Sequence, residues 1–243
     1  MKKKLLGAVL LAAGTWLAGC GRQETPIITG EGAPISRIFE VEDFNGIEAG
    51  GSFDVTFSIA PETSVELQMP ENLMDLHEVR VRNGQLQVRT PSGTGIQWGG
   101  TRPQLVVFAP DLDHVNLSGG ASFWGRDLIQ GESLEVNASG LASLDLDVDV
   151  VSLNVNASGT AQIGLRGTAQ NSDFNVSGIA VVSGRELSTG EAVIQGSGSS
   201  LVEILVLDLL DANLSGTSQV SYWGNPLEQR SRLSGTATIH SQE

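Results

Sequence analysis

Three carboxylates alternate with apolar residues in the segment Leu144-Asp145-Leu146-Asp147-Val148-Asp149. In an extended strand such side chains share one face and lie about 7 Å apart, because the side-chain direction repeats every second residue. Carboxylates arranged in this way can bind Ca²⁺, and two of them can serve as the acid and base of a glycoside hydrolase. An ion site or a glycosidase-like acid pair at Asp145, Asp147 and Asp149 is therefore one interpretation.

A column of paired charges on a solvated face is the other interpretation, and the sequence favours it. Counted from a recurring Ser-Gly pair, Asp147 has the same offset as Arg126, Arg166 and Arg185. If the repeats stack, Asp147 lies between Arg126 and Arg166, in exposed pairs worth about 0.2–1 kcal/mol each. A carboxylate neutralised by arginine is a poor metal ligand and a poor general acid. We therefore expect no catalytic residue, no metal site and no cofactor.

Histidine and serine give no other pattern that indicates catalysis. The three histidines, His77, His114 and His240, are scattered without metal-ligand spacing, and we expect surface or corner positions for them. No serine lies in a Gly-x-Ser-x-Gly nucleophile elbow, and Gly196-Ser197-Gly198 is predicted to be a chain corner.

Four aromatic residues remain to be explained. Trp98 is expected to be exposed in a Gly-rich loop between Thr90 and Arg102. Trp124 and Trp223, with Tyr222, have similar offsets in two repeats. They either cover the ends of the core or form a stacking platform for a sugar.

The element that must position these residues is a repeat between Val115 and His240. A Ser-Gly pair recurs seven times, at successive gaps of 18 to 21 residues: Ser118-Gly119, Ser139-Gly140, Ser158-Gly159, Ser177-Gly178, Ser197-Gly198, Ser215-Gly216 and Ser234-Gly235. A period of about 19 residues is typical of a solenoid, in which each unit buries its apolar side against the next unit.

Each repeat carries the same columns of residue types. Two residues before each Ser stands an Asn or Gln in six repeats, with Arg232 in the seventh, and apolar residues flank it in alternation. Three residues after each Ser stands Ala or Ser, and five residues after it a large or β-branched apolar residue. Strands that leave and enter a tight corner explain both columns. The fold class predicted is therefore all-β, a parallel β-helix.

The column of Asn residues has two interpretations. Side-chain amides stacked one coil apart can form a hydrogen-bonded ladder, as in other stacked β structures. Alternatively, because amides present both donors and acceptors, the column is a sugar-binding strip. The ladder is favoured.

Residues 1–19 are predicted to be a lipoprotein signal peptide. Lys2, Lys3 and Lys4 precede an apolar segment from Leu5 to Trp16, which is too short for an ordinary membrane-spanning helix. The following Leu17-Ala18-Gly19-Cys20 is similar to a bacterial lipobox, and Cys20, the only cysteine, is the predicted lipid attachment residue. We expect an exported protein anchored to the membrane, at the outer membrane, through lipidated Cys20.

Charge limits the partners of the exported chain. Removal of residues 1–19 leaves 11 basic and 28 acidic residues, a formal net charge of −17. So acidic a protein is not expected to bind nucleic acid. A partner in the cell envelope, either a protein or a glycan, is expected instead.

The remaining chain divides into a tether and one domain. Residues 20–35 are rich in Gly, Pro and Thr and are predicted to be a flexible tether. Residues 36–243 form a single β-solenoid domain, with an irregular β cap region at 36–110 and regular coils at 111–243. Within the cap region, Asn72 to Leu76 allow one helical turn, and Asn83-Gly84 indicates a β-hairpin.

The order of several motifs resembles the bacterial head GIN domain family, described as an autotransporter-adhesin head. The motifs are Phe44-Asn45-Gly46-Ile47, Gly50-Gly51-Ser52-Phe53-Asp54-Val55, Asn83-Gly84, Val115-Asn116-Leu117-Ser118-Gly119, the Ser-Gly corners and Tyr222-Trp223-Gly224-Asn225-Pro226. The resemblance extends from about Ile38 to the C-terminus. It implies a right-handed parallel β-helix in an exported, often lipid-anchored protein, and it brings no catalytic motif.

Three functions are compatible with these observations. The leading hypothesis is a lipid-anchored envelope protein that acts as a non-catalytic adhesion or interaction module. The alternatives are a carbohydrate-active β-helix enzyme and a periplasmic structural or stress scaffold without a small ligand.

Overall fold

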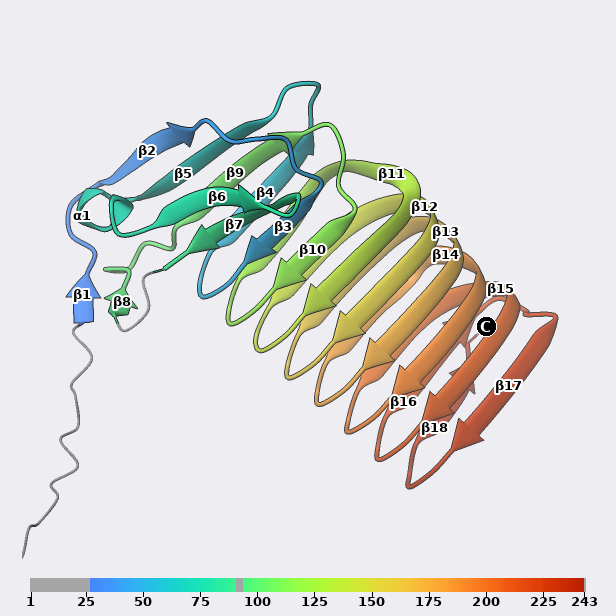
Figure 1. The fold of residues 1–243 in the computed structure, drawn as a ribbon. Helices are drawn as coiled ribbons and strands as arrows, with labels where there is room; N and C mark the ends of the chain where they lie inside the picture. Colours follow the sequence, from blue (N-terminus) through green and yellow to red (C-terminus); the bar gives the residue numbers. More distant parts are fainter. Residues whose placement is uncertain (1–26, 91–93, 243) are drawn as a thin grey trace, which may run out of the picture.

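A stack of β-coils forms most of the molecule in the computed structural model, which describes residues 27–90 and 94–242. The regular coils lie side by side in one row, and the cap region closes the end of the row opposite the last coil (Figure 1). The strands of the regular coils are β10 (His114–Leu117), β11 (Ser122–Ala138), β12 (Ser143–Ala157), β13 (Gln162–Val176), β14 (Val181–Gly196), β15 (Leu201–Leu214), β16 (Gln219–Trp223), β17 (Glu228–Leu233) and β18 (Thr238–Ser241).

Neighbouring coils pair in parallel, so that like residues lie beside like. Asn137 of β11 is in register with Asn156 of β12, and Asn156 with Asn175 of β13. The same parallel pairing continues from β10 to β18. The predicted β-solenoid with coils of about 19 residues is therefore confirmed.

The Ser-Gly corner explains the period. The glycine at each of the seven corners has φ between 69° and 76°, a left-handed conformation that favours glycine. At Gly159 a Cβ atom would also lie 2.9 Å from the carbonyl oxygen of Gly140 on the preceding coil. The backbones of neighbouring corners are this close because Thr160 N donates to Gly140 O at 2.7 Å.

The inward columns form one continuous apolar core. Val136, Val155, Phe174, Ile194 and Ala212 lie in successive register positions and are all buried. In the first six repeats the small residues three positions after each Ser, such as Ala161, are enclosed at the inside of the corner, and in the seventh Ala237 is partly buried. Residues five positions after each Ser are buried beside them in the first six repeats. Both predicted columns are confirmed.

The cap region, predicted at 36–110, begins at residue 27 in the structure and consists of nine short strands and one helical turn. These are β1 (Ile27–Thr29), β2 (Pro34–Phe39), β3 (Gly46–Ala49), β4 (Asp54–Ile59), β5 (Ser64–Pro70), α1 (Glu71–Met74), β6 (Glu78–Arg82), β7 (Gln85–Arg89), β8 (Gly95–Gln97) and β9 (Gln104–Ala109). Strands β3 and β4 add one more coil, since β3 pairs in parallel with β10 and β4 with β11. Gly51 makes their corner with φ 77°.

The next layer, β7 and β9, still pairs with β3 and β4 in parallel, and beyond it the pairing changes to antiparallel. Strand β6 pairs antiparallel with β7 across the predicted Asn83-Gly84 turn, and both turn residues have positive φ. Strand β5 is antiparallel to both β9 and β2. An antiparallel edge cannot be continued by a further identical coil, so the cap region ends the parallel stack.

Two expectations for the cap region need correction. Trp98 is not exposed but half-buried, because its ring packs edge-on against Phe53, with ring centroids 5.7 Å apart. Strand β1 lies inside the segment predicted to be a tether, and it pairs in parallel with β8 from Ile27 to Thr29.

The last coil presents polar residues where earlier coils present apolar ones. Gln229 and Ser231 of β17 are in register with the buried Leu210 and Ala212 of β15. The Tyr222 hydroxyl donates to Gln229 Oε1 at 2.9 Å, which satisfies the one polar atom of this ring. Exposed charged residues at Glu228, Arg230 and Arg232 discourage another strand from adding to this edge.

Candidate functional site

A groove follows the strands that lead into the corners. We call it the Asn–Ser groove, and its volume is about 640 Å³. Its polar lining consists of Glu48, Asn116, Asn137, Asn156, Asn175, Ser118, Ser139, Ser158 and Ser177. The Asn and Ser residues face outward because they occupy alternate positions on strands whose intervening residues enter the core. A smaller hollow of about 320 Å³, lined in part by Gln195 and Asn213, extends it over the next coils.

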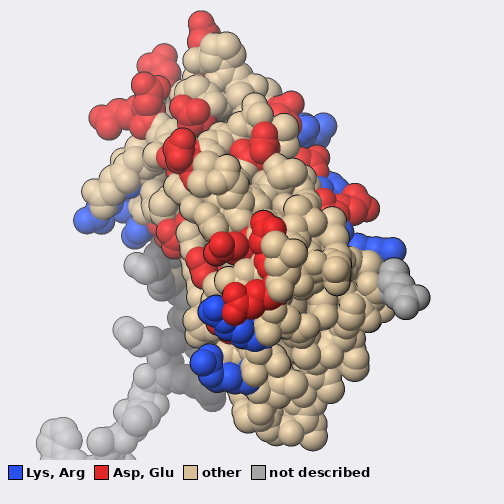
Figure 2. Space-filling view, turned by 90° about the vertical axis from the view of Figure 1, so that its right-hand side faces the viewer, with Lys and Arg blue, Asp and Glu red and all other residues tan. Residues whose placement is uncertain are grey.

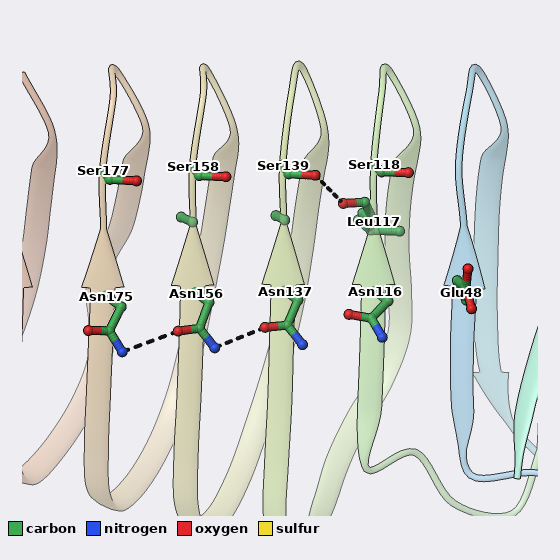
Figure 3. Close-up of a pocket in the computed structure, with 12 residues that line it drawn as sticks. Glu48, Asn116, Leu117, Ser118, Asn137, Ser139, Asn156, Ser158, Asn175 and Ser177 are labelled. Atoms are coloured by element: carbon green, nitrogen blue, oxygen red, sulfur yellow. Dashed lines mark hydrogen bonds between the residues drawn. The ribbon is translucent and has the colours of Figure 1, made fainter. Parts of the chain in front are cut away.

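Amide side chains in this groove bond to each other across coils (Figure 3). Asn156 donates from Nδ2 to Asn137 Oδ1 at 2.9 Å, and Asn175 donates to Asn156 Oδ1 at 3.1 Å. The predicted ladder is therefore confirmed for these three residues. Each amide has two N–H groups and a carbonyl with two lone pairs, so the ladder uses only part of the hydrogen-bonding capacity of Asn156. The rest faces the groove.

The acidic face is organised around one arginine. Arg166 donates from Nε to Asp147 at 2.6 Å and from Nη2 to Asp145, so that it joins the two carboxylates. These contacts raise the pKa of Arg166, first through Asp145 and then through Asp147. Asp149 accepts from Thr168 at 2.6 Å and from Gln130 at 3.2 Å, and these bonds lower its pKa.

The predicted charge column is only partly correct. Asp147 lies opposite Arg166, but on the other side it lies opposite Leu128 and not Arg126. Arg126 falls in an irregularity between Trp124 and Leu128, where β11 has two extra residues. Arg185 falls beside a similar irregularity, and its guanidinium instead covers the ring of Trp223 at 4.9 Å. A fixed offset from Ser fails in coils that carry extra residues.

The three acidic residues that could do chemistry are thus already bonded to neighbours. Asp145 and Asp147 share one guanidinium, so at least one oxygen of each is already occupied. Within residues 27–90 and 94–242, no group of three or more His, Cys, Asp or Glu side chains could hold a metal ion. The arrangement suits a solvated charged face.

The histidines occupy three different environments. His77 was expected near the surface, but it is buried in the cap region between Phe53 and Trp98. Its Nδ1 lies 2.8 Å from Leu73 O, and burial lowers its pKa, outweighing this hydrogen bond. His114 Nε2 lies 2.8 Å from Glu135 on the neighbouring coil, and His240 is exposed. A lone histidine in the sequence gives no signal of such burial.

The aromatic residues that have similar offsets in the sequence lie in different environments. Tyr222 is buried, and it helps to cover the last coils of the core. Trp124 instead points outward and is 45% exposed. It borders a second groove of about 510 Å³ on the strands that leave the corners. We call this the Trp124 groove; its lining includes Trp124, Ser143, Asp145, Gln162, Gly164 and Ser183.

Cys20, the predicted lipid attachment residue, and the predicted signal peptide at 1–19 lie outside the described residues. In the part of the chain that is described, no helix is long and apolar enough to cross a membrane.

The coil stack is similar to several solved bacterial structures. A protein described as "a putative adhesin" from Bacteroides fragilis NCTC 9343 has a TM-score of 0.84 at 20% identity, covering 88% of this chain and 100% of that chain. A "putative lipid binding protein" from Parabacteroides distasonis ATCC 8503 has a TM-score of 0.73 at 21% identity, covering 89% and 100%. A "putative adhesin" from Parabacteroides merdae ATCC 43184 has a TM-score of 0.68 at 20% identity, covering 90% and 100%. At these identities the likeness shows the fold.

No curated protein matches the chain. Residues 43–226, well over half of the chain, match one family. This range includes the coil of β3 and β4, the first six Ser-Gly corners and the Tyr222-Trp223-Gly224-Asn225-Pro226 motif. The protein therefore belongs to the family described as "Putative auto-transporter adhesin, head GIN domain".

Proposed function

We propose that the protein is a lipid-anchored, non-catalytic adhesion module of the bacterial cell envelope, which binds its partner along the Asn–Ser groove. The observation that carries the proposal is the row of outward amides and hydroxyls, repeated in register from Asn116 to Asn175. A row with a regular spacing of about 4.8 Å can bond an extended partner at several points. Several weak contacts on one rigid surface then add to useful affinity.

Charge supports this surface over the others. The seven Ser-Gly corners contain no Asp, Glu, Lys or Arg. Seen from the C-terminal end, acidic residues gather on the upper and central part of the molecule, and the lower part is largely free of charge (Figure 2). Apart from Glu48 at one end, the residues that line the Asn–Ser groove are uncharged, which favours a neutral partner that bonds through hydroxyl or amide groups.

The family description and the bonding of the carboxylates both favour binding over catalysis. The family description names an adhesin, and so do the descriptions of two of the similar structures. Asp145 and Asp147 are joined by Arg166, so neither is placed to donate a proton to a leaving group. These observations favour binding over a carbohydrate-active enzyme.

Anchoring through Cys20 limits how far the first described strand lies from the membrane. Ile27 begins the first described strand, in the cap region (Figure 1). The seven residues from Cys20 to Ile27 can span at most about 25 Å. With acyl chains on Cys20, the strand that begins at Ile27 therefore lies within about 25 Å of the membrane.

Adhesion of whole cells tests the proposal. Cells that make the full chain are compared with cells that lack it, for attachment to surfaces coated with envelope material. Ser158→Glu places a carboxylate in the Asn–Ser groove without removing a ladder amide, and we expect attachment to fall to the level of cells without the protein. Ser133→Glu is the matched control, because Ser133 is an exposed serine outside the groove. Equal attachment by both variants would refute a role for the groove.

Anchoring is tested separately. Labelling of cells with a fatty acid should mark the wild-type chain and not Cys20→Ser, which should appear in the soluble fraction. A labelled Cys20→Ser variant would contradict lipid attachment at Cys20.

A further inference from the structure

The Trp124 groove lies on the other side of the corners from the Asn–Ser groove, on the strands that leave them. Five outward residues of successive coils follow each other along it in register: Trp124, Asp145, Gly164, Ser183 and Glu203. Three coil spacings of about 4.8 Å separate Trp124 from Ser183, a length of about 14 Å. With a volume of about 510 Å³, the groove has room for a short chain of sugar rings.

Trp124 forms the apolar end of this groove. The indole ring is 45% exposed on the surface of the sheet, so a ligand that covers it removes apolar surface from water, which favours binding. The backbone of Trp124 is held in the sheet on both sides, in register with Thr56 and with Asp145. A flat aromatic face next to polar groups suits a ring that is apolar on one face and polar at its rim.

Asp145 supplies a fixed acceptor beside the ring. Arg166, one coil further along, binds Asp145 through Oδ1. The other oxygen, Oδ2, lies toward Gly164, where a Cβ atom would come within 3.1 Å of it. Because Gly164 has no side chain, this oxygen stays open to the groove. Arg166 thus positions the carboxylate through one oxygen, while the other oxygen remains free to accept.

Polar groups on the neighbouring coils complete the surface. Gln162 is exposed and lies in register with Ser143, and it carries both a donor and an acceptor. Ser183 is exposed one coil beyond Gly164. The groove thus offers an aromatic ring, a carboxylate positioned by Arg166, an amide and a hydroxyl, and Gly164 leaves its base free of side chains. Groups of this kind suit the binding of hydroxyl-rich rings.

We propose that the Trp124 groove binds a neutral oligosaccharide, with one sugar ring stacked on Trp124 and its hydroxyls bonded to Asp145 and Gln162. An anionic polysaccharide is disfavoured, because Glu203 follows Ser183 and the exported chain carries a formal net charge of −17. The inference names a ligand class for the proposed adhesion role, at a site separate from the Asn–Ser groove.

Binding is measured with the lipidated full chain purified in detergent. The probes are cellohexaose, mannohexaose and N-acetylchitohexaose, with polygalacturonate as the anionic comparison, and the signals are tryptophan fluorescence and isothermal titration. We expect at least one neutral probe to bind. Trp124→Ala should weaken it by about tenfold or more, and Trp124→Phe should keep most of the affinity. Gly164→Leu, which fills the floor of the groove, should also weaken it.

Trp223→Ala is the matched control, since it removes a tryptophan that lies outside the groove and under Arg185. Circular dichroism and thermal melting establish that each variant is folded, and Gly164→Leu tests the site without loss of an aromatic residue. Absence of binding to all three neutral probes, binding to polygalacturonate alone, or equal affinity of the wild type, Trp124→Ala and Gly164→Leu would overturn the proposal.

The two proposals fail in different ways. Loss of attachment in Ser158→Glu cells with no saccharide binding leaves the adhesion role in place and removes the Trp124 site. Saccharide binding that depends on Trp124, with attachment unaffected by Ser158→Glu, supports the Trp124 site and removes the role of the Asn–Ser groove.

Discussion

Asn156 donates from Nδ2 to Oδ1 of Asn137 across neighbouring coils, at 2.9 Å. The two residues are 19 positions apart in the sequence and directly opposite in the parallel register. Asn175 repeats the bond one coil further, so Asn156 is both donor and acceptor in the ladder. The side chains thus stabilise the same register that the backbone sets.

The first prediction concerns this ladder. Asn156→Ala removes two side-chain hydrogen bonds, each worth about 0.5–1.5 kcal/mol. We expect the free energy of unfolding to fall by about 1–2 kcal/mol, measured by denaturant unfolding of the purified chain. Asn154→Ala is the control, because Asn154 is exposed on the same strand outside the ladder, and its effect should stay within about 0.5 kcal/mol. Equal effects of the two changes would mean that the ladder contributes nothing.

The repeat predicted this relationship because it depends only on a fixed offset from the Ser-Gly corner. The same reasoning correctly placed the enclosed Ala161, and the turn preference of Asn-Gly correctly placed the hairpin at Asn83-Gly84. It failed for Arg126 and Arg185, where extra residues displace side chains from the shared register. The first gap between Ser-Gly pairs, 21 residues, already contained that irregularity.

The candidate site depended on orientations that no spacing encodes. Asp145 faces the Trp124 groove because Arg166 holds one of its oxygens and Gly164 leaves space for the other. Trp98 and His77 pack against each other and against Phe53. These three residues lie far apart in the sequence and meet only when the cap region folds. Sequence periodicity predicts no contacts in the cap region, because the chain does not repeat there.

The second prediction concerns the inside of the corner. Ala161→Phe forces a large ring into a fully enclosed position, and overpacking of this kind costs about 1–3 kcal/mol or more. Thermal melting should show a clear decrease in the unfolding temperature. Thr160→Leu is the control, because the corresponding residues of the neighbouring corners, Leu141 and Ile179, are large and exposed. An unchanged melting temperature for Ala161→Phe would refute the packing described for that column.

The third prediction concerns the corner glycines. Gly159 has φ 72°, and a Cβ atom on it would lie 2.9 Å from Gly140 O. Gly159→Ala therefore combines backbone strain with a close contact, and we expect a loss of about 1–3 kcal/mol in denaturant unfolding. Gly131→Ala should have a much smaller effect, because a Cβ atom there meets nothing within 4 Å. If both changes cost the same, the corner does not require glycine.

The fourth prediction is a pH dependence that arises in the cap region. Burial lowers the pKa of His77 below the 6.5 of an ordinary histidine. As the pH falls, the unfolded chain therefore takes up this proton before the folded chain does. The contribution of His77 to stability is complete above about pH 6.5 and is lost progressively as the pH drops toward the lower, folded-state pKa.

His77→Phe removes the titrating group while keeping a ring beside Phe53 and Trp98. Thermal melting at neutral pH and at mildly acidic pH should therefore show a smaller acid-induced decrease for His77→Phe than for the wild type. His240→Phe is the control, because His240 is exposed and its removal should leave the wild-type decrease intact. Among the described residues Nε2 of His77 has no hydrogen-bond partner, so a proton there would be buried without an acceptor. An acid-induced decrease of the same size in all three proteins would show that another group is responsible.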